Sequence, residues 1–310
     1  MDFGDTIVSA GQDAVEDIRA IGYHRFGEVV DPVAASRLLG EVRALRRFDE
    51  SLFLSEAEFD ADPQYRGVNP QPGHNMLERF EDRLGLVEAE PAIVSAVAAL
   101  LGPDYEILNK KLVCGVPAKA VPDWLKARIH GNPVNNLGAY VRPEYRDITY
   151  FYGIDFHQDL IDYKEREADF LTLYVYLHPV DAHDAPLFLL ENSHRFGGTV
   201  FPHGLTREWE GFWTYRDGRG QEMRARQLML TGGTGFAAMW HACTLHGTQP
   251  DAADRERISL RYLLAKRPGA KAAIDRVNAT LQGPLSLAST RVDLDASGAA
   301  QLKANAVNGG

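Results

Sequence analysis

Hydrophobic residues recur at helical spacing in two stretches of the first hundred residues. Asp31 can cap a helix that starts at Pro32, with a short helical turn and a strand over residues 23–29 before it. The apolar face of this helix would consist of Ala35, Leu38, Leu39, Val42 and Leu45. Residues 88–101 repeat the helical pattern, and Gly102 is typical of a helix end. The first third of the chain is therefore predicted to be largely helical.

Beyond residue 104 the pattern changes to that of buried strands. The expected strands are residues 105–114, 169–180, 185–190, part of 231–247, and 257–265. Two stretches lack any period and carry several prolines. Residues 51–75 are predicted to form a long loop, and residues 116–150 an irregular insertion. Irregularly spaced strands with helices near the N-terminus predict a β-sandwich or barrel with helical buttresses.

Composition narrows the class of protein. The chain has 310 residues, 45% hydrophobic and 25% charged, which is ordinary for a globular protein. The formal net charge is −10, and no run of Lys or Arg offers a surface for nucleic acid, so none is expected as a partner. Only Cys114 and Cys243 are present, and the N-terminal residues lack a signal-peptide pattern, so we expect a cytoplasmic protein. No apolar stretch approaches the roughly 20 residues that span a bilayer, and membrane insertion is not expected.

The segment "FHQDL" contains a candidate metal site. His157 and Asp159 are two positions apart, so on an extended strand their side chains share one face and could bind one cation. A third ligand is needed, and His246 is the candidate, because Arg257 follows eleven positions later and Ser259 shares the strand face of Arg257. A guanidinium beside a hydroxyl suits a carboxylate, as a keto acid near a metal would require.

These motifs resemble the phytanoyl-CoA dioxygenase family of iron(II)- and 2-oxoglutarate-dependent oxygenases. The resemblance covers roughly residues 12–265, through "FHQD", the stretch "DFLTLYVYLHPVDAHDAPLFLLENSHRFGG", and "LHGTQPDAADRERISLRY". It implies a mainly β fold with helical buttresses, a cupin-like double-stranded β-helix or jelly roll, in a single domain over residues 1–265. Residues 266–310 are expected to form a helix and a flexible tail, with residues 293–310 frayed, and their apolar stretches permit a homodimer contact.

The resemblance also implies the cofactors and the site. His157, Asp159 and His246 would bind Fe(II), and Arg257 with Ser259 would bind the far carboxylate of 2-oxoglutarate, with O2 as the oxidant. The hydroxyl groups of Thr248 and Thr172 are candidates to donate to 2-oxoglutarate. The implied reaction is oxidation, foremost hydroxylation, of an unactivated C–H bond in a small-molecule metabolite, with release of succinate and CO2. An intact carboxylate at position 159 argues against halogenation, since related halogenases have Gly or Ala there.

Several features depart from the family pattern or leave alternatives open. The turn "ENSH" replaces the family's P-G-S-H, and Phe156 replaces the usual Trp. The insertion is expected to cover the mouth of the substrate pocket. His241 lacks an arginine eleven positions later, so we interpret it as a strand residue and not a ligand, and His194 as a residue that holds its turn. The same iron chemistry could serve desaturation or ring formation. A zinc hydrolase and a non-catalytic metal-binding jelly roll are the other hypotheses.

Overall fold

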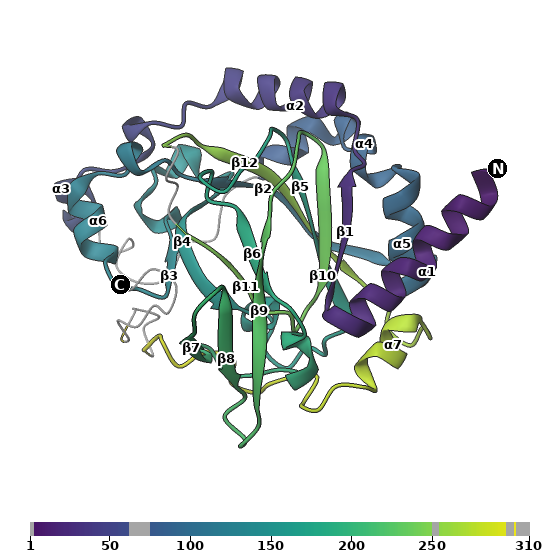
Figure 1. Ribbon diagram of the computed structural model, residues 1–310. Helices are drawn as coiled ribbons and strands as arrows, with labels where there is room; N and C mark the ends of the chain where they lie inside the picture. The colour runs from purple at the N-terminus through teal and green to yellow at the C-terminus, as the bar shows by residue number, and fades with distance from the viewer. Residues whose placement is uncertain (1–2, 62–74, 250–253, 296–300, 302–310) are drawn as a thin grey trace.

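The computed structural model describes residues 3–61, 75–249, 254–295 and 301 (Figure 1). The helices are α1 (Phe3–Ile21), α2 (Pro32–Leu45), α3 (Glu56–Ala61), α4 (Gly85–Glu88), α5 (Pro91–Leu101), α6 (Asp123–Ile129) and α7 (Ala273–Asn278). The strands are β1 (Tyr23–Glu28), β2 (Glu106–Gly115), β3 (Val134–Asn136), β4 (Thr149–His157), β5 (Phe170–Tyr176), β6 (Leu187–Leu190), β7 (Gly204–Arg207), β8 (Phe212–Arg216), β9 (Glu222–Leu230), β10 (Phe236–His241), β11 (His246–Thr248) and β12 (Arg257–Ala265). Two short 3-10 turns matter below, η7 (Asp159–Asp162) and η8 (Ser193–Phe196).

The strands form one continuous sheet that curves over on itself. Their order is β1-β10-β5-β12-β2-β4-β11-β6-β9-β8-β7, with β3 paired to β4. Among the described strands, β2 and β4 form a parallel pair and the other pairs are antiparallel. Figure 1 shows α1, α2 and α5 on the outside of this sheet. The expected fold class, a mainly β jelly roll with helical buttresses, is confirmed.

Strand β5 shows how the sequence produces two buried faces. Leu171, Leu173 and Val175 pack in the large core with residues of α2 and α5. Tyr174 and Tyr176, at the alternate positions, pack in a separate core with residues of β6 and β9. Because side chains alternate across a strand, one apolar run can cover the helices on one side and fill the interior on the other. The interior between the two layers is where the candidate site lies.

The two predicted helices are present, with differences at their ends. The Asp31 carboxylate accepts hydrogen bonds from the backbone of Val33 and Ala34, as expected for the cap of α2. Leu45, predicted to be part of the buried face, is 49% exposed because it lies in the last turn, beyond the sheet. Helix α1 spans 19 residues, whereas a short turn was expected there. Gly102 ends α5 with a φ of +91°, a conformation that glycine adopts at low cost.

The two predicted irregular stretches contain more structure than expected. Residues 51–61 of the expected loop include α3, and residues 62–74 lie outside the described part of the chain. The insertion at 116–150 contains α6 and β3, and β3 pairs with β4 beside the cavity. The strands β7 to β9 were not anticipated. Exposed positions alternate with buried ones in β8 and β9, so these hairpins lack the continuous apolar runs that identified the buried strands.

The segment after α7 is bound to the loops that precede β5 and β7. Backbone amides of Ala168 and Glu165 donate to the carbonyls of Leu285 and Leu287, and Thr290 accepts from the amide of Phe201. The expected frayed stretch lies mostly outside the described residues, and the domain boundary at residue 265 stays a prediction. A search of the described helices finds none with the length and apolar character needed to cross a membrane.

Candidate metal site and cavity

Two histidines and one aspartate meet at adjoining ends of β4 and β11. His157 ends β4, His246 begins β11, and the antiparallel pairing of these strands places the two residues opposite each other. Asp159 follows at the start of η7. Ligand atoms of the three side chains lie within 4.8 Å of one another, and His246 Nε2 is 3.6 Å from Asp159 Oδ2. The three residues selected from the sequence thus form a group that could hold a metal ion.

The hydrogen bonds of the two imidazoles prepare them as metal ligands. His157 Nδ1 lies 3.0 Å from the carbonyl oxygen of Asp155, and His246 Nδ1 lies 3.1 Å from that of Thr244. A carbonyl oxygen only accepts, so each Nδ1 carries the proton and each Nε2 keeps its lone pair. Burial lowers the pKa of His157, and burial together with neighbouring His157 lowers the pKa of His246 to about 3. Both rings are therefore neutral near pH 7, as metal binding requires.

Asp159 is surrounded by donors from three strands. Arg261 Nη2 of β12 donates to Oδ1, Thr172 Oγ1 of β5 donates to Oδ2, and Trp240 Nε1 of β10 lies 3.2 Å from Oδ2. Burial by itself would raise the pKa of this carboxyl, but the Arg261 guanidinium and the two histidines outweigh burial and hold the pKa well below its usual range. Asp159 is therefore a carboxylate, as a metal ligand must be.

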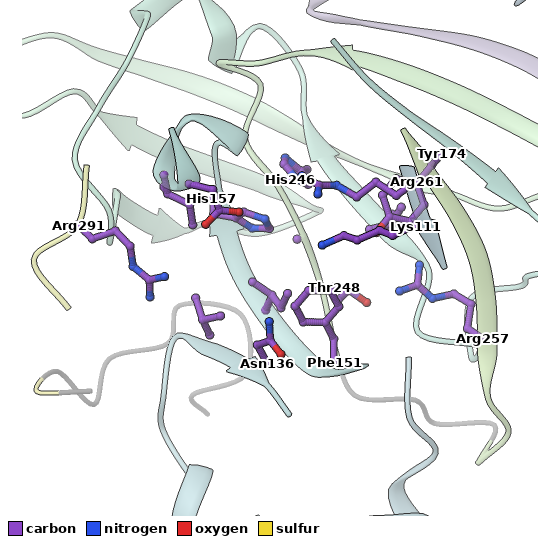
Figure 2. A pocket seen from close by; sticks show the side chains of 16 residues that line it. Lys111, Asn136, Phe151, His157, Tyr174, His246, Thr248, Arg257, Arg261 and Arg291 are labelled. Atoms are coloured by element: carbon purple, nitrogen blue, oxygen red, sulfur yellow. The ribbon is translucent and has the colours of Figure 1, made fainter. Parts of the chain in front are cut away.

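A cavity extends from the histidines across the interior (Figure 2). It holds about 760 Å³ of space free of protein atoms, open solvent at its mouth included. Figure 2 shows Arg257 at one side of the cavity, Arg291 at the opposite side, and Lys111 between them. Burial, and then the neighbouring Arg261, lower the pKa of Lys111 to about 8. The cavity therefore combines a metal-binding end with a strongly cationic lining.

Arg257 and Ser259, the two residues of the predicted fork, lie two positions apart on β12, and Arg257 lines the cavity. Arg257 is 1% exposed, and its Nε and Nη1 have no hydrogen-bond partner among the residues described. The buried Oγ of Ser259 likewise has none within the described part of the chain. Gly115 lies opposite Arg257 on β2, and a methyl group there would lie 3.3 Å from Arg257 Nε. The absence of a side chain at Gly115 leaves space for the Arg257 guanidinium. Within the described structure, Arg257 Nε and Nη1 and Ser259 Oγ are buried without a hydrogen-bond partner.

The hydroxyl groups of Thr248 and Thr172, both predicted to donate to 2-oxoglutarate, donate to groups of the protein instead. Thr248 lines the cavity, but its hydroxyl donates to the carbonyl of Ala185 at 2.9 Å. Thr172 donates to Asp159, a candidate metal ligand. The roles of both threonines toward 2-oxoglutarate stay predictions.

Sequence reasoning missed several cavity residues, among them Arg261, Asn136 and Arg291. Arg261 could have been found, because positions 257, 259 and 261 alternate onto the same strand face. Asn136 comes from the insertion, which was expected to cover the pocket mouth, and β3 does line the cavity. Arg291 comes from the segment after α7, and no sequence pattern indicated that this segment returns to the site.

The two discounted histidines lie outside the ligand group. His241 Nδ1 accepts from the amide of Cys243, and its Nε2 donates to Asn278 Oδ1 at 2.9 Å. His194 Nε2 donates to the carbonyl of Arg19 at 3.3 Å, which ties the turn η8 to α1.

Comparisons with known proteins identify the fold. No family model matches this chain, and no curated protein sequence matches it. Among solved structures, the non-heme alpha ketoglutarate dependent epimerase SnoN from nogalamycin biosynthesis is 16% identical, with a TM-score of 0.50 over 91% of this chain and 95% of SnoN. SnoN in complex with Fe3+, alpha ketoglutarate and nogalamycin RO is 15% identical, with a TM-score of 0.51 over the same shares of the two chains. This likeness shows a shared fold, and the phytanoyl-CoA dioxygenase resemblance stays a prediction.

Proposed function

We propose that this protein is an iron(II)- and 2-oxoglutarate-dependent dioxygenase that hydroxylates an unactivated C–H bond of a small-molecule metabolite. The observation that carries the proposal is the buried guanidinium of Arg257, whose Nε and Nη1 find no acceptor in the described residues. A buried cation with unused donors requires an anionic partner. One carboxylate of 2-oxoglutarate fits this requirement, and the cavity connects the fork to the candidate metal ligands.

The set of ligands favours iron over zinc. Two imidazoles and one carboxylate on one face of an ion, with open positions opposite, are typical of non-haem Fe(II) oxygenases. A zinc hydrolase requires a water molecule and a general base and does not require a buried arginine that binds the carboxylate of a co-substrate. Arg257 and Ser259 therefore count against that hypothesis. A non-catalytic jelly roll has no reason to keep the three ligands and the fork together.

The residues of the chain have distinct roles in this proposal. His157, Asp159 and His246 hold the metal, and Arg257 with Ser259 orients 2-oxoglutarate. When bound, iron and 2-oxoglutarate supply the activation of O2 that oxidises the substrate, with release of succinate and CO2. Side chains such as Phe151, Ile154 and Leu187 give the cavity apolar walls, which exclude water from the reacting carbon.

The substrate would enter between β3 and the segment after α7. Asn136 accepts the amide of Gly138 with its Oδ1, so its Nδ2 is left to donate, and Figure 2 shows this side chain and Arg291 facing the cavity. Two polar groups on an otherwise apolar wall suit a small metabolite. The neighbour SnoN binds nogalamycin RO, which supports a role in secondary metabolism. A cytoplasmic location and a homodimer remain predictions.

The test is an anaerobic titration with Fe(II) and 2-oxoglutarate, followed by a substrate screen that measures succinate. The wild-type protein should bind both and release succinate slowly even without substrate. His157→Ala should lose Fe(II) binding and succinate release. His241→Gln, which changes a buried histidine outside the ligand group, should keep both. Iron binding without any binding of 2-oxoglutarate would contradict the proposal and favour the non-catalytic alternative.

The product distinguishes hydroxylation from its alternatives. A hydroxylated product is one oxygen atom heavier than the substrate, whereas desaturation or ring formation gives a product two hydrogen atoms lighter. Mass spectrometry of any substrate that stimulates succinate release therefore decides between them.

A further inference from the structure

The carboxylate of Asp159 accepts hydrogen bonds from three side chains that lie far from it in the sequence. It lies in η7, after β4 has ended, so no strand ladder fixes its backbone as β11 fixes His246. Its donors come instead from the opposite layer of the sheet, from adjacent strands β10, β5 and β12. These donors are Trp240, Thr172 and Arg261.

We propose that Arg261, Thr172 and Trp240 form a clamp that holds Asp159 in the orientation in which a single carboxylate oxygen is available to the metal. The clamp rests on the proposed metal site but not on the identity of the co-substrate. Its members are positioning residues, because they act on the metal through Asp159.

The geometry assigns a different task to each carboxylate oxygen. Arg261 donates to Oδ1 and so fixes the direction of this oxygen. Oδ2 is the oxygen 3.6 Å from His246 Nε2, so it is the one that faces the ligand group. Thr172 and Trp240 both donate to Oδ2 and so set its direction. A carboxylate without the clamp could rotate and chelate with both oxygens, which would take one of the open positions that the chemistry needs.

Trp240 couples two of the ligands. Its ring lies 4.9 Å from the His246 ring, centroid to centroid, while its Nε1 lies 3.2 Å from Asp159 Oδ2. One rigid side chain therefore contacts both the second histidine and the carboxylate. Partners of this kind orient metal ligands, and their loss typically weakens metal binding about 10- to 100-fold.

The first experiment measures the dissociation constant of Co(II), a spectroscopic substitute for Fe(II), for variants of Thr172. Thr172→Val should weaken Co(II) binding about tenfold and change the visible absorption spectrum of the bound ion, and Thr172→Ser should restore both. Thr199→Val is the matched control, because this buried hydroxyl forms a hydrogen bond with Tyr215 Oη at 2.6 Å, outside η7, and does not contact Asp159. The control should bind Co(II) as the wild-type protein does.

The second experiment applies the same measurement to Arg261. Arg261→Met should weaken Co(II) binding about tenfold and shift the spectrum toward higher coordination, although the loss of a nearby positive charge would by itself tighten binding. Arg261→Lys should recover part of the affinity. Arg46→Met is the control, because it breaks another buried arginine–aspartate pair, with Asp147, and should lower the melting temperature without changing Co(II) affinity.

The outcomes separate this inference from the proposed function. Unchanged Co(II) affinity and spectra in Thr172→Val and Arg261→Met would overturn the clamp and leave the metal site intact, as would tighter binding in Arg261→Met. A wild-type protein that does not bind Co(II) or Fe(II) would overturn both. Equal weakening in Arg46→Met and Arg261→Met would identify a general loss of structure and would also overturn the clamp.

Discussion

Arg257→Met tests whether the buried arginine is a binding residue or a structural one. Methionine keeps much of the side-chain length and removes the charge and the donors. In the ligand-free protein, Arg257 Nε and Nη1 have no acceptor in the described structure, so the wild-type residue bears an uncompensated desolvation cost. Leaving such a buried polar group unsatisfied costs about 1–3 kcal/mol. The ligand-free variant should therefore be more stable than the wild-type protein by about this amount.

Arg257→Met should weaken the binding of 2-oxoglutarate, and this loss of binding free energy should exceed the gain in stability of the ligand-free protein. Removing one partner of a buried, hydrogen-bonded charge pair costs about 2–5 kcal/mol of binding free energy. At about 1.4 kcal/mol per factor of ten, the dissociation constant should rise by roughly 30- to 4,000-fold. A ligand at 100 times its dissociation constant stabilises the wild-type protein by about 2.7 kcal/mol, and the same concentration should stabilise the variant by less than about 1 kcal/mol.

The assay is urea denaturation under anaerobic conditions with Fe(II), with and without 2-oxoglutarate. Arg46→Met is the control: it breaks a buried ion pair with Asp147 and should be less stable, while the stabilisation by 2-oxoglutarate is unchanged. The reasoning is refuted if Arg257→Met is destabilised like the control and still gains the full stabilisation from 2-oxoglutarate.

Two further predictions concern the neighbours of this fork. Gly115→Ala should weaken 2-oxoglutarate binding by up to about tenfold, because the added methyl group would lie 3.3 Å from Arg257 Nε and displace the guanidinium. Isothermal titration measures this affinity. An unchanged affinity would contradict the prediction and show that the guanidinium can move without loss of binding. Lys111→Met should stabilise the protein near pH 7, because burial and Arg261 lower the pKa of Lys111 from 10.5 to about 8 and make its charged form unfavourable in the folded state. The folded lysine loses its proton above about pH 8 and the unfolded one near pH 10.5, so the gain should shrink across this interval in urea denaturation; a gain that does not change with pH would contradict this reasoning.

Sequence patterns predicted the elements that are buried on at least one regular face. Helix α2 could be read from its cap and its apolar spacing, β5 from its nearly continuous apolar character, and β12 from its apolar residues at alternate positions. The hairpins β7 to β9 and the helix α6 in the insertion escaped prediction, because their sequences lack the long apolar runs that mark the buried strands and the long apolar repeat that marks α2 and α5. Strands β7, β8 and β9 pair with their neighbours in sequence, and among the described strands only the pairing of β9 with β6 joins this hairpin unit to the rest of the sheet.

The candidate site divides in the same way. His157 and Asp159 are two positions apart, and Arg257 and Ser259 share a strand face, so local spacing was enough to select them as candidates. Arg291 lies more than a hundred residues after His157 and Asp159 in the chain, and only the docking of the segment after α7 brings it to the cavity. The assignment of Thr172 to 2-oxoglutarate rested on its strand, whereas the structure shows that it donates to Asp159.

The sequence by itself determined which side chains can share a face, because alternation along a strand and the three-to-four-residue repeat of a helix are properties of the local backbone. It thereby indicated the shared face of Arg257 and Ser259 and a mainly β core wrapped by helices, whereas the candidate ligand Asp159 lies in η7, beyond the end of the strand that carries His157. The tertiary structure alone decided which faces meet. The convergence of β5, β10 and β12 on Asp159, and of β3 and the C-terminal segment on the cavity, follows from the curvature of one sheet into two layers. Contacts of this kind join residues far apart in the chain, so no local pattern records them.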